Sequence, residues 1–235
     1  MSDQYALIDK AIAPYILRNA FVYENLPVSD RAALETASPP QQMRRKKILF
    51  RQGTYPHGAF RLHSGKVKIY TESPNGQRQT ICIYTDGDLL GYRQLLSDEA
   101  YPISAELLED SSIGLIPAEV FQTVVRESSF FSRNLLEALA REFSIWMNRL
   151  IVFAQHPVQS RLILCLLILH RIYTREGRQI TPITITRTEL AEYVGASLET
   201  VVRALAPLRA AGMVQVQGRR IILPDPVGLL VYLPS

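Results

Sequence analysis

The stretch TRTELAEYVGASLETVVRAL, residues 186–205, has the features of two short helices joined by a tight turn. Thr186 is followed by Glu189 three residues later, and this capping box predicts that a helix begins there. Gly195 can adopt a positive φ without steric cost, as the end of that helix requires. Ser197 then predicts the N-cap of a second helix. The stretch therefore predicts a helix-turn-helix.

Apolar side chains divide each predicted helix into a buried and an exposed face. Leu190, Ala191 and Val194 form the buried face of the first helix. Val201 and Leu205 form the buried face of the second. In a helix-turn-helix, the exposed residues at the start of the second helix face the major groove of DNA. Here they are Leu198, Glu199, Val202 and Arg203.

Glu199 and Arg203 are four residues apart and share one face of the second helix. Arg can donate two hydrogen bonds to N7 and O6 of guanine, and Glu can accept one from N4 of cytosine. The alternative is a surface ion pair, which stabilises a helix by about 0.3–0.5 kcal/mol. The capping residues and the glycine turn beside them favour base reading. The side chains expected to hold phosphates are Arg187, Ser197, Thr200, Arg219 and Arg220.

Pro207 lies inside the second predicted helix. It has no N–H to donate to the carbonyl of Arg203, and its ring crowds the preceding turn. We expect a kink or an early end of the helix there, beyond the residues that face DNA.

The positive charge of the chain is concentrated around this motif. The formal net charge is +4, and residues 156–235 carry nine Arg and five acidic residues, which accounts for the whole excess. Two short strands are predicted on either side of Gly218, so that Arg219 and Arg220 lie at the tip of a wing. A basic lobe on a neutral remainder favours a polyanion as partner, here double-stranded DNA.

Residues 43–121 have a different character, with short runs rich in Val, Ile, Tyr and Thr separated by glycines. In residues 65–88, KVKIY and QTICIY alternate on either side of the turn SPNG, which predicts a β-hairpin. Many short strands with turn signals predict an antiparallel sandwich or barrel. The basic run RRKK, residues 44–47, is expected to be a solvated strand start.

Residues 128–154 contain no Gly or Pro and predict a helix of more than about six turns. Apolar residues recur there at intervals of three and four, as in a coiled coil. They are Leu136, Leu139, Phe143, Trp146, Leu150 and Phe153. A second stripe beside them holds Leu135, Ile145, Ile151 and Val152. The helix could pack on its own sheet alone, but two stripes favour a homodimer through the six-residue seam.

The dipeptide His156–Pro157 ends the long helix, because a proline disfavours helical geometry in the residue before it. We interpret it as a hinge and a domain boundary. The expected domains are a sensor domain with N-terminal helices over residues 1–127, a dimerisation helix over 128–155 and a DNA-binding domain over 156–235. The fold class is α+β: a jelly-roll-like β-barrel, a long helix and a winged helix-turn-helix.

Composition argues against several other classes of protein. No apolar run approaches the roughly 20 residues of a membrane span, and the N-terminus lacks the basic and apolar blocks of a secretory signal. Cys82 and Cys165 lie far apart in apolar runs, so neither a disulfide framework nor a zinc or iron–sulfur cluster fits them. We expect a reduced, cytoplasmic protein without a membrane segment.

The segment ITRTELAEYVGASLETVVRALAPLRAAGMV, residues 185–214, resembles the winged helix-turn-helix signature of the CRP/FNR family of bacterial transcription regulators. ILFRQG, HSGKVKIY and GDLLGY resemble, less specifically, its cyclic-nucleotide-binding β-roll. The long apolar helix corresponds to the family's dimer helix, so the resemblance covers nearly the whole chain. It implies a homodimer on an inverted DNA repeat, with recognition helices about 34–36 Å apart. It also implies RNA polymerase as a partner if the protein activates transcription.

The resemblance further implies a particular DNA half-site. Members of the family share a Glu and an Arg at the positions of Glu199 and Arg203, and these read a TGA-like core. The cAMP-dependent members place another Arg where this chain has Leu198, whereas FNR-type members have an apolar residue there. The expected half-site is therefore TTGA-like.

An effector pocket in the β-roll is also implied, but one that does not suit cAMP. Gly91 is followed by Tyr92 where cAMP-binding members have Glu, and Tyr101–Ala105 offers no Arg to the phosphate. A buried phosphate without a cation is costly. The pocket either takes an apolar or aromatic ligand or is filled by side chains. The residues expected to line it are Gly91, Tyr92, Tyr101, Ser104, Trp146 and Met147.

Other sensors of the family fit less well. An iron–sulfur cluster needs about four cysteines, and a thiol switch needs thiols outside apolar runs. Haem stays open as a cofactor, although a lone histidine is more often structural; no other metal site is expected. The candidate haem ligands are His57, His63, His156 and His170.

An enzyme on the β-domain is the competing class. A cupin-like metal site needs clustered His and Glu, yet His57 and His63 are six residues apart with no His-x-His pair. No nucleophile-elbow or phosphate-loop motif is present. We therefore expect a regulator and not an enzyme. A second alternative is a cyclic-nucleotide-dependent regulator with a rearranged pocket.

Overall fold

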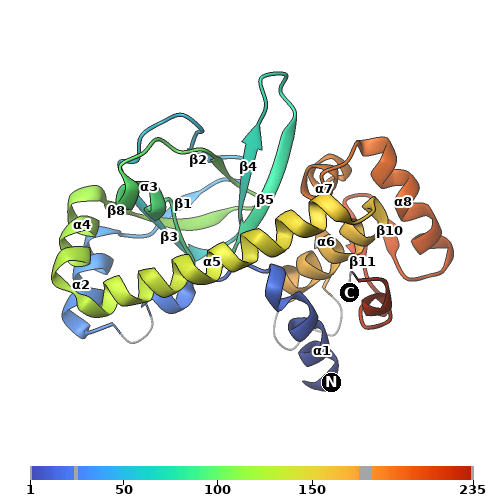
Figure 1. The fold of residues 1–235 in the computed structure, drawn as a ribbon, viewed down its shortest axis with the longest axis horizontal. Helices are drawn as coiled ribbons and strands as arrows, with labels where there is room; N and C mark the ends of the chain where they lie inside the picture. Colours follow the sequence, from blue (N-terminus) through green and yellow to red (C-terminus); the bar gives the residue numbers. More distant parts are fainter. Residues whose placement is uncertain (1, 24–25, 175–180, 234–235) are drawn as a thin grey trace. The chain divides into compact units, whose positions relative to one another are not determined.

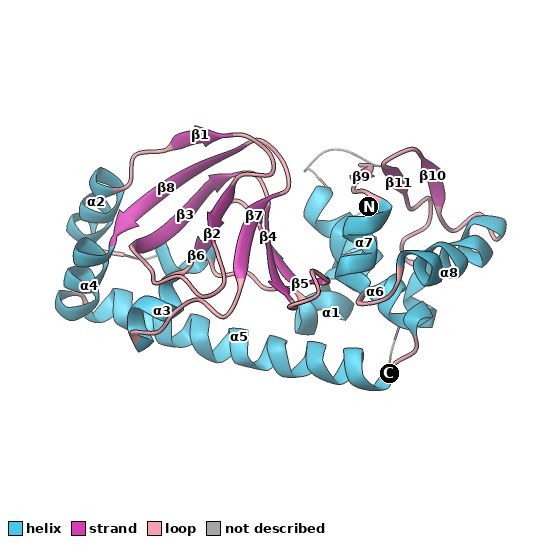
Figure 2. Ribbon diagram, turned by 90° about the horizontal axis from the view of Figure 1, so that it is seen from above, coloured by secondary structure: helices cyan, strands magenta, loops and turns pink. Residues whose placement is uncertain are grey.

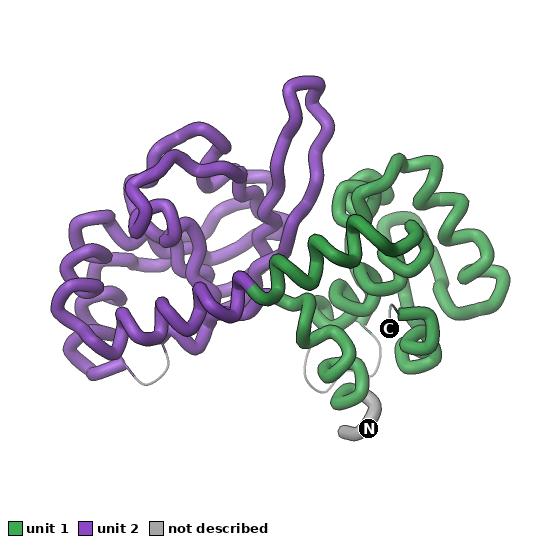
Figure 3. Tube along the Cα trace, in the orientation of Figure 1, with its two compact units in different colours: residues 1–16, 144–235 green, residues 17–143 purple. Residues whose placement is uncertain are grey.

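A computed structural model describes residues 2–23, 26–174 and 181–233. The chain divides into two compact units, coloured separately in Figure 3. Residues 17–143 form one unit, called here the β-roll unit. Residues 1–16 and 144–235 form the other, called here the winged-helix unit.

The β-roll unit contains two four-stranded antiparallel sheets, with strand orders β1-β8-β3-β6 and β2-β7-β4-β5. The expected antiparallel sandwich or barrel is confirmed, and Figure 2 shows its strands side by side. The strands are β1 (Gln41–Met43), β2 (Ile48–Phe50), β3 (Gly58–Ser64), β4 (Val67–Glu72), β5 (Arg78–Tyr84), β6 (Leu89–Leu90), β7 (Ser104–Leu107) and β8 (Ser111–Pro117).

The predicted hairpin is the pair β4 and β5, in which Val67 lies opposite Tyr84 and Glu72 opposite Arg78. The turn between them is closed by Ser73, whose N–H donates to the carbonyl of Gln77 at 2.9 Å. Gly76 has φ 79°, a conformation that a glycine adopts without strain. Local turn chemistry therefore fixed this hairpin, as the Asn-Gly signal indicated.

Helices of the β-roll unit pack against its sheets. Figure 2 shows α2 and α4 near β8, and these elements share a buried core with the start of α5. Leu34, Phe121 and Phe131 are fully buried there. Aromatic edge contacts add to area burial, as between Phe121 and Phe131 at 5.5 Å between ring centroids. The helices of this unit are η2 (Ala20–Tyr23), α2 (Val28–Ala37), α3 (Tyr92–Ser97), α4 (Ala118–Glu127) and the first part of α5 (Ser129–Gln155).

Helix α5 runs over 27 residues (Figure 1), and its apolar side chains differ in exposure around the helix. Leu136, Phe143 and Leu150, at intervals of seven, expose 68%, 68% and 63% of their surface. The other expected seam residues, Leu139, Trp146 and Phe153, are half-buried. On the buried face lie Leu135, Ala138, Glu142, Arg149 and Val152. The exposed apolar stripe is therefore narrower than the predicted seam, with Met147 and Ile151 exposed beside it.

The winged-helix unit is built around α6, in which every residue from Leu162 to His170 is buried. Helices α7 and α8 both pack on α6, and three short strands in the order β10-β11-β9 complete the unit. No helix in the described ranges is long and apolar enough to cross a membrane. The elements are α6 (Val158–Tyr173), β9 (Ile183–Thr184), α7 (Arg187–Val194), α8 (Leu198–Ala210), β10 (Gln215–Gln217), β11 (Arg220–Ile222) and η3 (Gly228–Tyr232).

The N-terminal helix α1 (Ser2–Ile12) belongs to the winged-helix unit, which differs from the expected assignment of residues 1–127 to one domain. Ile8 and Ile12 are buried, and α1 contacts α6. Asp9 pairs with Arg171 of α6. The short helix η1 (Ala13–Tyr15) follows α1. Burial of two isoleucines, not position in the chain, determines where this helix packs.

The helix caps of the winged-helix unit give a test of how much of its stability is local. Thr186→Ala removes the side-chain acceptor of the Glu189 N–H. We expect it to lower the free energy of unfolding by about 1 kcal/mol, measured by urea denaturation. Thr188→Ala, at an exposed site two residues further along the chain, should change this free energy by less than about 0.5 kcal/mol. Equal effects of the two substitutions would contradict the capping role.

Candidate nucleic-acid interface

Helix α7 begins and ends as its sequence indicates. Thr186 Oγ1 accepts a hydrogen bond from the N–H of Glu189 at 3.1 Å, and Glu189 Oε2 accepts one from the N–H of Thr186 at 2.8 Å. Gly195 ends the helix with φ 67° and ψ 47°, and its N–H donates to the carbonyl of Ala191 at 2.9 Å. A side chain at this φ would be strained, so the glycine sets the turn into α8.

Helix α8 begins at Leu198 because Ser197 caps it. Ser197 Oγ accepts from the N–H of Thr200 at 3.1 Å, and the two hydroxyl oxygens lie 2.8 Å apart. Arg161 of α6 holds the turn itself, since its Nη1 donates to the carbonyl of Gly195 at 3.3 Å. The two helices are thus fixed to each other and to α6 before any DNA is bound.

The start of α8 brings the four expected base-reading residues onto one exposed surface. Val201 and Leu205 are buried on the opposite face of the helix. Leu198 and Val202 are large apolar side chains with 48% and 49% of their surface exposed. Glu199 and Arg203 are exposed beside them. Exposed apolar groups together with a donor and an acceptor are what a major-groove surface requires, including contact with thymine methyl groups.

Glu199 and Arg203 do not form the surface ion pair that was the alternative explanation of their spacing. The i, i+4 ion pair found among the described residues is Glu137 with Arg141 on α5. No carboxylate–guanidinium pair of the described chain joins Glu199 to Arg203. Both side chains are therefore available to another molecule.

The candidate phosphate-binding residues lie at two places around this surface. Arg219 is exposed in the turn of the β10–β11 hairpin, beside Gly218, and Arg220 is exposed as the first residue of β11. Arg187 is half-buried at the start of α7, and its Nη2 donates to the carbonyl of Gly218 at 3.0 Å. Burial and the nearby charge of Arg209 lower the pKa of Arg187 below its ordinary value. Arg187 thus joins the helix-turn-helix to the wing.

Pro207 does not end α8. The expected early end is wrong, because the helix continues to Ala210. Only one N–H is missing at Pro207, and its own carbonyl still accepts from the N–H of Ala211 at 3.0 Å. The proline lies on an exposed part of the helix, where its ring has room.

The residues of the expected effector pocket that belong to the β-roll unit are already bonded within the protein. Tyr92 is buried and its hydroxyl donates to Glu142 Oε1 at 3.0 Å. Ser104 Oγ accepts from the N–H of Gln52 at 2.9 Å. The hydroxyl of Tyr101 lies 3.5 Å from the carbonyl of Gly91. Of the remaining two residues, Trp146 is half-buried and Met147 exposed, and both belong to the winged-helix unit.

Glu142 is a buried carboxylate that the sequence analysis did not single out. Its Oε1 accepts from Asn19 Nδ2 and from the hydroxyl of Tyr92, each at 3.0 Å, while Arg93 Nε lies 3.7 Å from Oε2. Burial raises the pKa of Glu142, and Arg93 and the hydrogen bonds oppose that change. A charged residue among the apolar positions of the long helix was the signal that could have revealed it.

Arg149 is a second buried charge on α5, and its partners lie in the winged-helix unit. Its Nη1 donates to the carbonyl of Tyr15 and to the hydroxyl of Tyr193, each at 3.2 Å. The guanidinium also lies over the rings of Tyr193 and Phe153, at 5.0 and 5.6 Å from their centroids. Arg149 therefore fixes the last turns of α5 to the first helix of the helix-turn-helix.

The histidines considered as haem ligands lie apart in different settings. His57 is exposed at the end of the β2–β3 loop, and His63 is half-buried with a pKa lowered by burial. His156 is half-buried after the end of α5. His170 is buried, stacked on Tyr5 at 6.4 Å between ring centroids, and burial lowers its pKa. Among the described residues, no three His, Cys, Asp or Glu side chains are grouped as a metal site.

Two family models match the chain. A cyclic nucleotide-binding domain model matches residues 40–128, and a Crp-like helix-turn-helix domain model matches residues 160–232. The first match falls on the strands of the β-roll unit and α4. The second covers nearly all of α6 and extends through η3.

Similar proteins are bacterial transcription regulators. The transcriptional activator protein Anr of Pseudomonas aeruginosa is 23% identical over 94% of this chain and 89% of its own length. The anaerobic regulatory protein of Pasteurella multocida is 25% identical over 80% of this chain and 69% of its own length. A CRP-like cAMP-activated global transcriptional regulator of Mycobacterium tuberculosis is 27% identical over 89% of this chain and 95% of its own length.

Solved structures share the fold. A crp/fnr-family regulator from Eubacterium rectale has a TM-score of 0.75 at 21% identity, covering 93% of this chain and 100% of that one. FixK2 from Bradyrhizobium japonicum has a TM-score of 0.74 at 22% identity, covering 84% of this chain and 98% of that one.

A cyclic-nucleotide-binding-like β-domain followed by a helix-turn-helix defines a DNA-binding transcription regulator and not an enzyme. The chain belongs to the CRP/FNR family of these regulators.

The buried carboxylate gives the protein a predictable dependence of stability on pH. Because the pKa of Glu142 is raised on folding, the folded state binds its proton more tightly than the unfolded state. Its contribution to stability is therefore present at low pH and is lost as pH rises above about 4, the ordinary pKa of Glu.

Glu142→Gln replaces the titrating carboxyl group by a neutral amide. The free energy of unfolding of the wild type should therefore fall relative to that of this variant as the pH rises from 4 to 8. Urea denaturation at several pH values measures the difference. Glu137→Gln, at an exposed site of the same helix, should run parallel to the wild type. If the free energy of unfolding of Glu142→Gln also runs parallel to that of the wild type, the pKa of Glu142 is the same in the folded and unfolded states.

Proposed function

We propose that this protein is a homodimeric transcription regulator that binds an inverted repeat through helix α8. The observation that carries the proposal is the exposed surface at the start of α8, where Leu198, Glu199, Val202 and Arg203 lie together. Two-fold symmetry would place two such helices in successive major grooves, about 34–36 Å apart. The protein would then act where the bacterial chromosome lies, in the cytoplasm.

The proposed half-site is TTGA-like. Arg203 would donate to N7 and O6 of a guanine, and Glu199 would accept from N4 of a cytosine on the opposite strand. The apolar Leu198 stands where cAMP-type members of the family carry a further Arg. Arg187, Ser197, Thr200 and the wing residues Arg219 and Arg220 would hold phosphates, which orients α8 without reading sequence.

Dimerisation would use the exposed stripe of α5. Leu136, Phe143 and Leu150 leave most of their surface in water, and their spacing of seven matches a two-helix seam. The half-buried Leu139, Trp146 and Phe153 would flank the contact. Exposed apolar area of this extent on one helix favours burial against a second copy of it.

The proposed effector is not cAMP. Tyr92 occupies the position of the ribose-binding Glu and is bonded to Glu142, and Pro102 stands in a segment that offers no Arg to a phosphate. Haem as a cofactor remains a prediction, for which His57, His63, His156 or His170 would have to supply a ligand to the iron. RNA polymerase would be a partner if the protein activates transcription.

A cyclic-nucleotide-dependent regulator is the second candidate, because the relative from Mycobacterium tuberculosis is named as cAMP-activated. Calorimetric titration with cAMP and with cGMP separates the two. Binding of either nucleotide by the wild type would overturn the role given to Tyr92.

The proposed DNA function is tested by selecting binding sequences from a random duplex pool with purified protein. An inverted repeat with TTGA-like halves supports it. Recovery of an inverted repeat with a different core would overturn the proposed TTGA-like half-site but would still support a dimeric DNA-binding regulator. Salt-sensitive binding without any selected sequence would contradict specific recognition by the unliganded protein.

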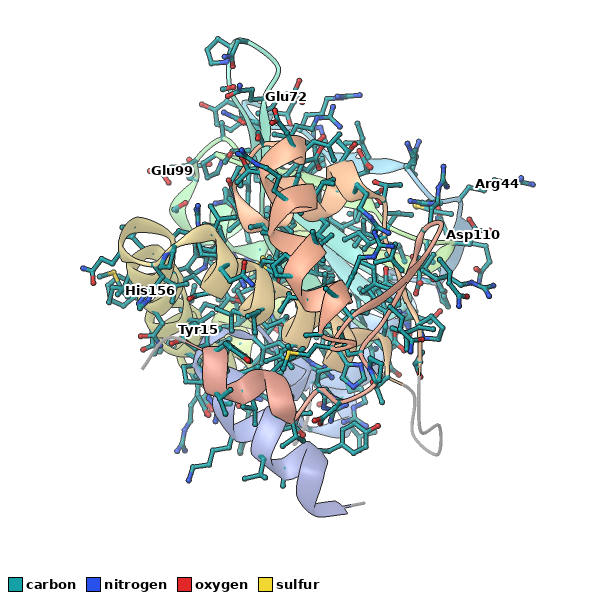
Figure 4. All side chains as sticks on the ribbon, turned by 90° about the vertical axis from the view of Figure 1, so that its right-hand side faces the viewer. Tyr15, Arg44, Glu72, Glu99, Asp110 and His156 are labelled. Atoms are coloured by element: carbon teal, nitrogen blue, oxygen red, sulfur yellow. The ribbon has the colours of Figure 1, made fainter. Side chains whose placement is uncertain are left out.

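Arg203→Ala should weaken binding to the selected site by about 1–3 kcal/mol and leave binding to random DNA nearly unchanged. Fluorescence anisotropy on both duplexes measures this. Arg44→Ala removes the same charge from an exposed side chain of the β-roll unit that extends away from the fold (Figure 4). Equal losses on the two duplexes would mean that Arg203 contacts phosphate and not a base.

Leu150→Glu should convert the dimer to a monomer at micromolar concentration, because a charge would be desolvated in the seam. Analytical ultracentrifugation gives the mass directly. Gln155→Glu adds the same charge at an exposed site of α5 away from the stripe and should remain dimeric. A dimer for both variants would place the contact elsewhere.

A further inference from the structure

The β-roll unit contains a cavity of about 700 Å³ that is not lined by Tyr92 or Ser104. It lies between β2, the loop of residues 51–57 and β3, and it opens to solvent. Its volume falls in the range of roughly 300–1,000 Å³ that small-molecule sites occupy. Tyr92 and Ser104 are already bonded within the protein, whereas this cavity is open to a ligand.

The floor of the cavity is aromatic. Phe50 stacks on Tyr101 with 4.0 Å between ring centroids, and Phe60 lies 5.9 Å from Phe50. Phe50 and Tyr101 are nearly completely buried, whereas Phe60 is half-buried. A planar apolar group could therefore rest against this cluster with favourable ring contacts.

The rim of the cavity is cationic. Lys46, Lys47 and Arg51 line it, and all three are exposed. No acidic residue stands among the described residues that line it. The ion pairs of the described chain also leave these three cations out. Lys46 and Lys47 of the basic run, together with Arg51, therefore place uncompensated positive charge around an apolar floor.

The cavity is tied to the segment that follows α3. Gly53 donates its N–H to the carbonyl of Tyr101 at 2.7 Å, and the N–H of Tyr101 donates to the carbonyl of Thr54 at 2.9 Å. The hydroxyl of Tyr101 lies 3.5 Å from the carbonyl of Gly91, the residue before α3. A ligand stacked on this floor would therefore act on the segment from Gly91 to Tyr101.

We propose that this cavity is the effector site and that it takes a small aromatic carboxylate. The ring would lie against Phe50, Phe60 and Tyr101, and the carboxylate would meet Lys47 and Arg51. Charge-assisted hydrogen bonds to Lys or Arg are about twice as strong as neutral ones, which would select the anion over a neutral analogue. The inference rests on the proposed function, because it names the effector class of that regulator.

The binding test uses 2-naphthoate and its neutral isostere 2-naphthamide, titrated calorimetrically into the full-length protein. The wild type is expected to bind naphthoate at least about tenfold more tightly than the amide, as one charged hydrogen bond supplies. Arg51→Gln should reduce that preference, because Lys47 alone then meets the carboxylate, and Arg44→Gln, outside the cavity, should leave it unchanged. Leu115→Trp, at an exposed lining position, should block both compounds.

Equal binding of naphthoate and naphthamide, no binding of either at millimolar concentration, or an unchanged preference in Arg51→Gln would each overturn the proposal. The regulatory part has its own readout, the affinity for the selected DNA. Naphthoate should change that affinity at least about fivefold in the wild type and not in Leu115→Trp; no change in the wild type overturns it. If the wild type and Leu115→Trp both select the inverted repeat while naphthoate does not bind the wild type, the DNA-binding function is supported and the cavity proposal is overturned.

Discussion

Two buried charges on α5 impose the strongest constraint on this structure. Glu142 and Arg149 are seven residues apart, so they lie on the same face of the helix. Leaving either charge buried without a partner would cost several kcal/mol, more than most single apolar contacts contribute. Each has hydrogen-bond partners inside its own unit, Glu142 in Asn19 and Tyr92, and Arg149 in Tyr193 and the carbonyl of Tyr15. The exposed stripe of Leu136, Phe143 and Leu150 lies on a different side of the helix.

The partner of Glu142 also distinguishes this β-roll from one that binds a cyclic nucleotide. In a pocket for a cyclic nucleotide, the residue after Gly91 would offer a polar group to the ribose. Here the hydroxyl of Tyr92 donates to Glu142 Oε1 at 3.0 Å, so that group is already bonded within the protein. An open volume in this unit is instead lined by Phe50 and Tyr101 and by the cations Lys46, Lys47 and Arg51. The proposed effector site would therefore use a different chemistry with the same strand order.

The DNA-binding surface depends on much shorter-range forces. Thr186, Gly195 and Ser197 act on backbone groups no more than four residues away, so the orientation of α7 and α8 is specified locally. What tertiary packing adds is a support behind the motif, through Arg161 at the turn and Arg187 at the wing. Because the scaffold that carries Glu199 and Arg203 is already ordered, little of the free energy of DNA binding would be lost in ordering the protein.

The sequence by itself determined the helix-turn-helix, the β4–β5 hairpin and the apolar stripes of α5, because caps, turn residues and periodicity act over a few residues. It identified the exposed residues of α8 for the same reason. Of the kink or early end expected at Pro207, the early end is wrong, since one missing hydrogen bond does not outweigh the bonds that continue α8 beyond it. Only the tertiary structure decided that Asn19 meets Glu142, 123 residues away, and that Asp9 meets Arg171, 162 residues away. Such pairs leave no local pattern, because burial and charge compensation select partners in space, not along the chain.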